Sequence, residues 1–468
     1  MKETNKRILF SAPKSGSGKT MITCGLLKAF LLRGIDCCSF KCGPDYIDPM
    51  FHKAVLGIDG RNLDTFFLDQ KAVKDHFLRG SSQAELSVIE GVMGYYDGMG
   101  GDSTWASSYE VACAVEAPVV MILDCRGASL SLAAVIKGFL EYKSDSHIEG
   151  VILNRISAVM ASRLTPQLET LGIRVYGYLP ECEEAEVLSR HLGLVLPGEM
   201  EDLKEKLKKL AGKLEETIDI DGLLELAAQA APLDTNKKTK ETEYPIYKGR
   251  KVRVGIAMDE AFCFYYQENL ALLKDMGADL IPFSPLKDDL LPDEICGIIL
   301  GGGYPELYLE QLSENKTMLK EISNAYEEDL PILAECGGFL YLHEELESSD
   351  NKVYSMAKII PGRAFPTGRL KRFGYIEAIA KTDTPFLKKG ETIKGHEFHY
   401  WDSTNNGEDF KAQKPGRNIN WDCVSTKKNL MAGFPHFYYP SNSKLPQRFM
   451  EACRQMRKEK ENDCEYKV

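Results

Sequence analysis

Residues 7–20 of the chain read RILFSAPKSGSGKT, and they predict a strand, a glycine-rich loop and the start of a helix, in that order. Glycines let a loop turn its backbone amides toward phosphate oxygens, and the start of a helix adds partial positive charge. Lys19 is then placed to reach terminal phosphates, and Thr20 can bind Mg²⁺. This stretch therefore predicts a phosphate-binding loop at the start of an α/β domain.

The loop departs from the strict pattern GxxxxGK[ST], because Pro13 stands where the first glycine is expected. Its second half, Gly16 to Thr20, is intact. Lys14 completes the pattern KxGxGKT, which resembles the loop of dimeric partitioning-type ATPases, where such a lysine reaches across a dimer. A homodimer is therefore one assembly that the loop allows. The loop residues that we expect to contact nucleotide are Lys14, Gly16, Ser17, Gly18, Lys19 and Thr20.

Length, charge and cysteine content narrow the class of protein. The 468 residues suit two domains of roughly 200 residues each. A net charge of -11 argues against a general binder of nucleic acid or membrane surfaces. The thirteen cysteines are scattered and odd in number, which favours a reducing compartment over a disulfide scaffold. No apolar run suits a signal peptide or a membrane-spanning helix, so we expect a cytoplasmic protein.

Short apolar runs alternate with amphipathic stretches over residues 1–231 and predict a parallel sheet with helices on both faces. Residues 232–250 are polar and contain two prolines, which predicts a linker. A second α/β pattern at 251–468 predicts a different domain. The expected strands are Ile8–Ser11, Cys37–Lys41, Val88–Glu90, Val119–Asp124, Val151–Asn154, Val252–Met258, Ile298–Leu300 and Ile332–Ala334, and the clearest helices are Met21–Arg33, Tyr109–Glu116 and Leu130–Tyr142.

Carboxylates follow two of the expected strands in the first domain. Asp45 and Asp48 lie in the segment FKCGPDYIDP after the second strand, and Glu90 ends the strand before GVMGYYDG. Loops at the carboxyl ends of parallel strands form the ligand crevice of an open α/β sheet. An aspartate beside a proline is often only a turn former. Three acidic residues after strands of a phosphate-binding domain nevertheless favour a metal site.

A second motif, AECGGF at 334–339, predicts a strand, a tight turn at Cys336 and a helix start. This is the pattern of a nucleophile elbow. A thiolate there could attack the amide of glutamine and form a thioester with release of ammonia. The upstream segment GGGYPE can offer the backbone amides of Gly302 and Gly303 to the developing oxyanion. The general base could be His396, His399 or His436, and spacing alone does not choose among them.

Taken together, these segments resemble the cobyrinate a,c-diamide synthase family. The resemblance implies a P-loop amidation domain followed by a class I glutamine amidotransferase domain. It implies that ATP, with Mg²⁺, phosphorylates a carboxylate of cobyrinic acid, and that ammonia from glutamine displaces the phosphate on the a and c acetate side chains. The motifs that carry it occur in family order over almost the whole chain: FKCGPDYIDPMFH, GRNLDTFF, EGVMGYYDG, GVILNR, IAMDEAFCFYY, GGGYPE, AECGGF and GHEFHY.

The resemblance also assigns site residues, residue by residue. It places the nucleophile on Cys336 and the general base on His436. The family usually has a second histidine two residues after that base, but Tyr438 stands there, and the His-x-Glu pairing of many class I amidotransferases is missing. At the other end the resemblance places a nucleotide contact on Asn154 and metal contacts on Thr20, Asp45 and Glu90. Apart from the resemblance, we expect Asp48, Lys41 and Arg61 to contact substrate, because Lys41 and Arg61 lie in or beside the predicted crevice loops and could offset the charge of a polyanionic ligand.

Two other functions compete with this hypothesis. One is a diamide synthase that acts on another tetrapyrrole, such as hydrogenobyrinate or nickel-sirohydrochlorin. The other is a partitioning-type ATPase switch whose carboxyl-terminal half is an inactive module. The second reading leaves the Cys336 elbow and the GGGYPE segment without a purpose.

Overall fold

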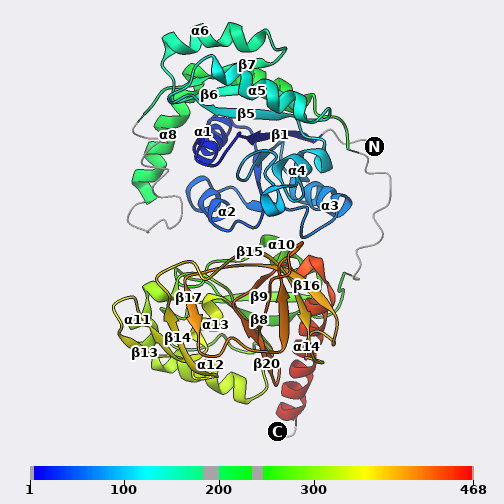
Figure 1. Cartoon of the computed structure of the whole chain (residues 1–468). Helices are drawn as coiled ribbons and strands as arrows, with labels where there is room; N and C mark the ends of the chain where they lie inside the picture. Colours follow the sequence, from blue (N-terminus) through cyan, green and yellow to red (C-terminus); the bar gives the residue numbers. More distant parts are fainter. Residues whose placement is uncertain (1–4, 183–199, 234–245, 466–468) are drawn as a thin grey trace. The chain divides into compact units, whose positions relative to one another are not determined.

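The computed structural model describes residues 5–182, 200–233 and 246–465. The chain divides into two compact units, Met1–Thr239 and Lys240–Val468, each with its own central sheet (Figure 1). Most of the predicted linker at 232–250 lies outside the described residues, which leave out 234–245. Among the helices in the described ranges, none is long and apolar enough to cross a membrane.

The first unit is built on a parallel sheet of seven strands: β1 (Lys6–Ser11), β2 (Cys37–Cys42), β3 (Gly60–Leu63), β4 (Leu86–Glu90), β5 (Val119–Asp124), β6 (Ile148–Asn154) and β7 (Arg174–Leu179). Their order is β3-β2-β4-β1-β5-β6-β7. Strands such as β2 and β4 are buried along their whole length, as expected for a parallel sheet that is covered on both faces. The fold class predicted for this half is confirmed.

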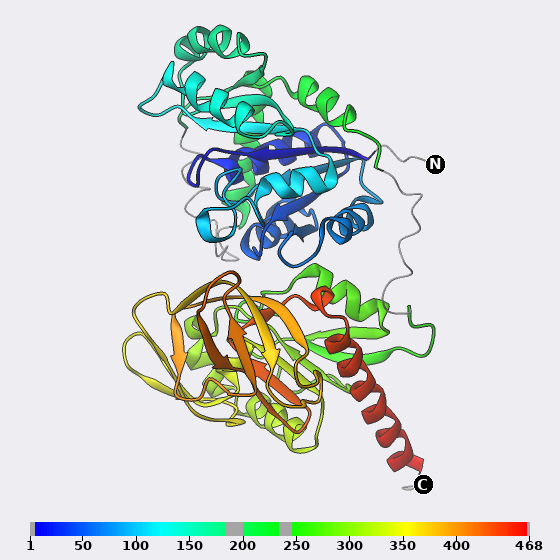
Figure 2. The same ribbon diagram turned by 45° about the vertical axis from the view of Figure 1, so that its right-hand side comes forward.

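Helices cover both faces of this sheet (Figures 1 and 2). They are α1 (Lys19–Leu32), α2 (Ile47–Phe51), α3 (Gln70–Ser81), α4 (Ser108–Val115), α5 (Ser131–Tyr142), α6 (Ala158–Glu169), α8 (Met200–Thr217) and α9 (Ile220–Ala228), with the π-helical segment η1 (His52–Leu56) and the 3₁₀ turn η2 (Met99–Gly101). Ile8 and Phe10 of β1 pack in one core with α1, α8 and α9. Leu9 packs in the other core with α3, α4, α5 and α6. The alternation along β1 therefore reflects its position between two helical layers.

The second unit has a six-stranded central sheet made of β8 (Val252–Ala257), β9 (Ala278–Phe283), β10 (Ile298–Leu300), β11 (Ile332–Glu335), β20 (Ser425–Lys427) and β21 (Leu430–Gly433). The order is β20-β21-β11-β10-β8-β9, and only β20 runs antiparallel to its neighbour. Its helical segments are α10 (Gln267–Asp275), α11 (Leu309–Glu314), α12 (Lys316–Glu327), α13 (Gly337–Tyr341) and α14 (Lys444–Glu465), with η4 (Pro305–Leu307) and η5 (Tyr439–Ser441). The predicted second α/β domain is thus confirmed.

Two smaller sheets extend this unit. One contains β12 (His343–Glu347), β13 (Val353–Ser355), β14 (Ile360–Pro366) and β17 (Trp401–Ser403), and the other contains β15 (Arg372–Ala380), β16 (Thr392–His399), β18 (Phe410–Gln413), β19 (Asn420–Cys423) and β22 (His436–Phe437). The pairing of β16 with β22 sets His396 opposite His436. These sheets therefore bring histidines that are distant in the sequence to one place.

Candidate functional site

The phosphate-binding loop joins β1 to α1 and is held in shape by a residue at the end of β6, two strands away in the sheet. Gly16 and Gly18 adopt left-handed φ angles of 77° and 93°, a conformation that favours glycine. A Cβ at Gly18 would lie 2.3 Å from Nδ2 of Asn154. The same Nδ2 donates a hydrogen bond of 2.8 Å to the carbonyl of Ser17. Asn154, at the end of β6, therefore clamps the loop, and its contact with nucleotide stays a prediction.

Lys19 is buried at the start of α1, whereas Lys14 is exposed. The Lys19 ammonium donates to the carbonyl of Met93 at 2.5 Å and to the carbonyl of Lys14 at 3.3 Å. Burial, and then the charge of Lys41, lowers the pKa of Lys19 to about 8. A bound phosphate would favour the charged form of Lys19, so this environment suits a lysine that meets terminal phosphates.

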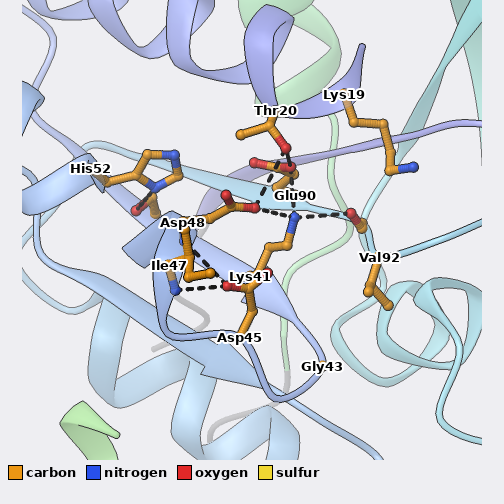
Figure 3. A network of polar contacts seen from close by, with 12 residues as sticks. Lys19, Thr20, Lys41, Gly43, Asp45, Ile47, Asp48, His52, Glu90 and Val92 are labelled. Carbon is orange, nitrogen blue, oxygen red and sulfur yellow. Dashed lines mark hydrogen bonds and ion pairs between the residues drawn. The ribbon is translucent and has the colours of Figure 1, made fainter. Parts of the chain in front are cut away.

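Thr20, the residue after Lys19, contacts a buried network of charged side chains at the carboxyl ends of β2 and β4 (Figure 3). The Thr20 hydroxyl donates to Glu90 and, over 3.4 Å, to Oδ2 of Asp48. The ammonium of Lys41 lies 2.5 Å from Asp48 and 2.7 Å from Glu90. The side chain of Glu90 is wholly buried, and those of Lys41 and Asp48 are nearly so. Thr20, Lys41, Asp48 and Glu90 are called the carboxylate network below.

Burial and ion pairing act in opposite directions on the carboxylate network. Burial raises the pKa of Glu90 to about 7, although Lys41 pulls it down. Burial also opposes the charged forms of Asp48 and Lys41, but their mutual attraction prevails. The pKa of Asp48 is therefore held below its ordinary value and that of Lys41 above it. The network is a set of buried charges that depend on one another.

The network offers oxygen ligands of the kind that Mg²⁺ prefers. Oε2 of Glu90 is buried and makes no hydrogen bond within the described part of the chain. The described residues contain no group of three His, Cys, Asp or Glu side chains that would hold a metal ion alone. A magnesium ion here would thus share Thr20, Asp48 and Glu90 with nucleotide phosphates, a mode that is common for this metal.

Asp45 lies beside this network, whereas Arg61 lies against α3. Oδ1 of Asp45 accepts hydrogen bonds from the amides of Ile47 and Asp48, at 2.8 and 3.2 Å, and so shapes the turn that begins α2. A Cβ at Gly80 of α3 would lie 2.7 Å from Cδ of Arg61. Asp48, predicted to contact substrate, is thus the aspartate that meets Thr20. The metal role of Asp45 and the substrate role of Arg61 stay predictions.

Cys336 lies at the turn between β11 and α13 in the second unit. Its backbone has φ 48° and ψ -100°, and its amide donates a hydrogen bond of 2.8 Å to the carbonyl of Gly433. Such strained backbone at a strand-to-helix turn is typical of a nucleophile elbow. Burial, and then the carboxylates of Glu306 and Glu397, keeps the pKa of the thiol above its ordinary value. Cys336 would therefore need a base to act as the predicted nucleophile.

His436 lies against the GGGYPE segment. A Cβ at Gly302 would be 2.3 Å from Cε1 of His436, and a Cβ at Gly303 would be 2.1 Å from the carbonyl of Ala261. Only glycine allows this close approach at the two positions. The amide nitrogen of Gly303 also lies 3.1 Å from where a Cβ of Gly337 would be. The structure thus brings the two predicted oxyanion residues beside both the histidine and the elbow.

The other two histidines have distinct surroundings. His396 lies opposite His436 on β16 and is buried. His399 stacks on Phe434 with ring centroids 3.9 Å apart, and its Nδ1 is 2.6 Å from the carbonyl of Trp401. Burial, and then His396 and His399, lowers the pKa of His436 to about 3. His436 is therefore neutral at physiological pH, as a general base must be before it takes a proton.

Glu335 is a site residue that sequence reasoning missed. Its Oε2 lies 4.0 Å from Nδ1 of His436, where a carboxylate could orient the ring. Burial raises the pKa of Glu335 to about 8, although the Phe437 amide and the Tyr439 hydroxyl bind its charged form. The His-x-Glu spacing looks for this carboxylate after the histidine and so does not point to Glu335. The signal in the sequence is its place directly before Cys336.

Comparison with known proteins covers nearly the whole chain. Residues 8–195 match the family described as the CobQ/CobB/MinD/ParA nucleotide binding domain, and residues 253–444 match the CobB/CobQ-like glutamine amidotransferase domain. The chain is 39% identical to the cobyrinate a,c-diamide synthase of Caldanaerobacter subterraneus over 95% of this chain and 98% of the relative. It is 37% identical to that of Salmonella typhimurium over 94% and 97%. The chain therefore belongs to the cobyrinate a,c-diamide synthase family of glutamine-hydrolysing ligases.

Proposed function

We propose that this protein amidates the a and c acetate carboxylates of cobyrinic acid through acyl-phosphate intermediates, with glutamine as the source of ammonia. The observation that carries the proposal is the match of both units, over almost their full length, to relatives that are named cobyrinate a,c-diamide synthase. The geometry of the two sites supports it, because one unit presents a phosphate-binding loop and the other a nucleophile elbow.

Carboxylate activation belongs to the first unit. A carboxylate oxygen of the substrate attacks the γ-phosphorus of ATP, and ADP leaves. Lys19 and the amides of the loop offset the charge of the phosphates as that bond breaks. Thr20, Asp48 and Glu90 would hold Mg²⁺, which would supply positive charge to offset that of the phosphates. Ammonia then attacks the acyl carbon and inorganic phosphate leaves, which yields the amide.

Ammonia production belongs to the second unit. His436 takes the thiol proton of Cys336, and the sulfur attacks the amide carbon of glutamine. The amides of Gly302 and Gly303 stabilise the oxyanion, and His436 returns the proton to the departing ammonia. Water then hydrolyses the thioester and releases glutamate. Glu335 faces the other ring nitrogen of His436 and orients the ring through these steps.

The loop pattern supports a homodimer in which Lys14 contacts nucleotide across the interface, since its side chain is exposed. Light scattering with and without ATP should then show a dimer, at least when nucleotide is bound. A protein that stays monomeric with ATP bound would contradict this assembly.

The central experiment is mass spectrometry of cobyrinic acid after incubation with the protein, ATP, Mg²⁺ and glutamine. We expect product with two added amides, and none without ATP. Hydrogenobyrinate and nickel-sirohydrochlorin serve as competing substrates in parallel reactions. A higher kcat/KM for either of them would reassign the substrate within the family. ATP hydrolysis with no amidation of any of the three would favour a nucleotide switch instead.

A further inference from the structure

The ammonium of Lys41 occupies the centre of the carboxylate network (Figure 3). It contacts Oδ2 of Asp48 at 2.5 Å and Oε1 of Glu90 at 2.7 Å. The hydroxyl of Thr20 donates to these same two oxygens. Lys41 therefore competes for the very atoms with which the network would bind a metal ion beside Thr20.

We propose that Lys41 is a resident counter-cation that keeps free divalent metal ions out of the network, so that metal enters only together with nucleotide. The proposal rests on the assignment of the nucleotide site above. It goes beyond that assignment by giving Lys41 a positioning role toward the metal ligands.

Electrostatics gives the reason for the competition. A magnesium ion approaches carboxylate oxygens to about 2.1 Å. It cannot share the two network oxygens with an ammonium already within hydrogen-bonding distance of both, because two cations at such separation repel strongly in a buried site. A free ion must therefore displace Lys41, so the net free energy of its binding is small. A metal ion carried by ATP arrives with phosphate charge, which also gives the displaced ammonium a new anionic partner.

The surroundings of Lys41 show why the network needs a cation at all times. Asp48 comes from α2 and Glu90 from β4, and Asp45 adds a third carboxylate whose charge acts on Lys41. Lys19 is another cation near the network, but it donates to the carbonyls of Met93 and Lys14. Buried carboxylates without a counter-charge are strongly destabilising. Lys41 fills that need from within β2.

The test is Mn²⁺ binding to the full-length protein without nucleotide, measured by electron paramagnetic resonance. Lys41→Met should bind Mn²⁺ at least about tenfold more tightly than the wild type, because one repelling charge is removed from contact distance. Its melting temperature should be lower than that of the wild type without metal and should rise more steeply as Mn²⁺ is added. Lys53→Met, at an exposed lysine that pairs with Asp59, is the matched control and should behave as wild type.

Two further variants keep the test decisive. Lys41→Gln removes the charge but keeps hydrogen-bond donors, and it replaces Lys41→Met if that variant does not fold. Lys41→Met combined with Glu90→Gln should lose the gain in Mn²⁺ affinity. The inference is overturned if neither single variant at Lys41 binds Mn²⁺ more tightly than the wild type, or if the gain survives in the double variant. These readouts require no amidation, so they stand apart from any failure of the proposed reaction.

Discussion

The two units differ in the charge of their buried reactive side chains. In the first unit the mutual attraction of Lys41 and Asp48 keeps both groups charged, although burial raises the pKa of Glu90 to about 7. In the second unit burial pushes the reactive groups toward their neutral forms, with the pKa of Glu335 raised to about 8 and that of His436 lowered to about 3. One site is thus charged before its ligand arrives, and the other acquires charge only during the reaction.

The largest difference between the two units should appear when the predicted nucleophile, Cys336, is replaced. Cys336→Ala should lower glutamine-dependent amidation by about a thousandfold or more, because the proposed thioester forms on the Cys336 sulfur. Amidation with added ammonium should stay near the wild-type rate, since the first unit is untouched. Both rates can be measured by mass spectrometry of the product. Cys296→Ala, just before β10, is the control and should amidate like the wild type. A wild-type rate of amidation with glutamine in Cys336→Ala would refute the assignment of the nucleophile.

Lys19→Ala tests the charged site in the same assay. Both the glutamine and the ammonium reactions should fall by about a hundredfold or more, because the terminal phosphates lose their ammonium partner. Glutaminase activity, measured as glutamate release, should persist. Lys28→Ala on the same helix is the control. Amidation from ammonium and ATP at the normal rate would show that nucleotide binds elsewhere.

Gly302→Ala tests the close packing of the neutral site. The added methyl group would lie 2.3 Å from Cε1 of His436 and must displace the ring. We expect glutaminase kcat to fall by about tenfold to a hundredfold, with the ammonium reaction unchanged. Gly138→Ala on α5, where a Cβ meets no atom within 4 Å, should have no effect. An unchanged glutaminase kcat in Gly302→Ala would mean that His436 is not the base in this position.

Glu335→Gln should have the smallest effect on glutaminase activity. If Glu335 orients His436, glutaminase kcat should fall by about tenfold. Stability should also respond to pH, because the pKa of Glu335 is raised from 4.5 to about 8 in the folded protein. The folded state binds the extra proton, so this contribution is complete below about pH 4.5 and is lost as pH rises through about 8. Urea unfolding across that range should show a steeper loss for wild type than for Glu335→Gln, and parallel curves would contradict the shift.

Local pattern was enough to predict some parts of these sites. The segment around Lys19 and the elbow at Cys336 each lie within one strand, turn and helix, so their geometry is encoded in adjacent residues. The carboxylate network depends instead on the order of β2, β4 and β1 in the sheet, which no local pattern determines. The contacts of Asp48 with Thr20 and Lys41 follow from this strand order, and the substrate role that the sequence suggests for Asp48 stays a prediction.

Local sequence pattern also could not predict the position of Glu335 or the two smaller sheets. Glu335 faces His436 only because β22 returns to pair with β16 beside the end of β11. Several strands of the two smaller sheets are only three or four residues long, too short for a clear alternation of apolar and polar residues. Tertiary pairing, rather than local preference, defines these parts of the molecule.

The clamp between Asn154 and the Ser17 carbonyl has a thermodynamic consequence. Because this hydrogen bond orders the loop in the folded protein, the loss of the loop's conformational entropy occurs during folding and not when the ligand binds. Nucleotide affinity then depends on the contacts themselves and not on ordering the chain. Asn154→Ala should shift that cost to the binding step, which calorimetry would record as a more unfavourable binding entropy for ATP.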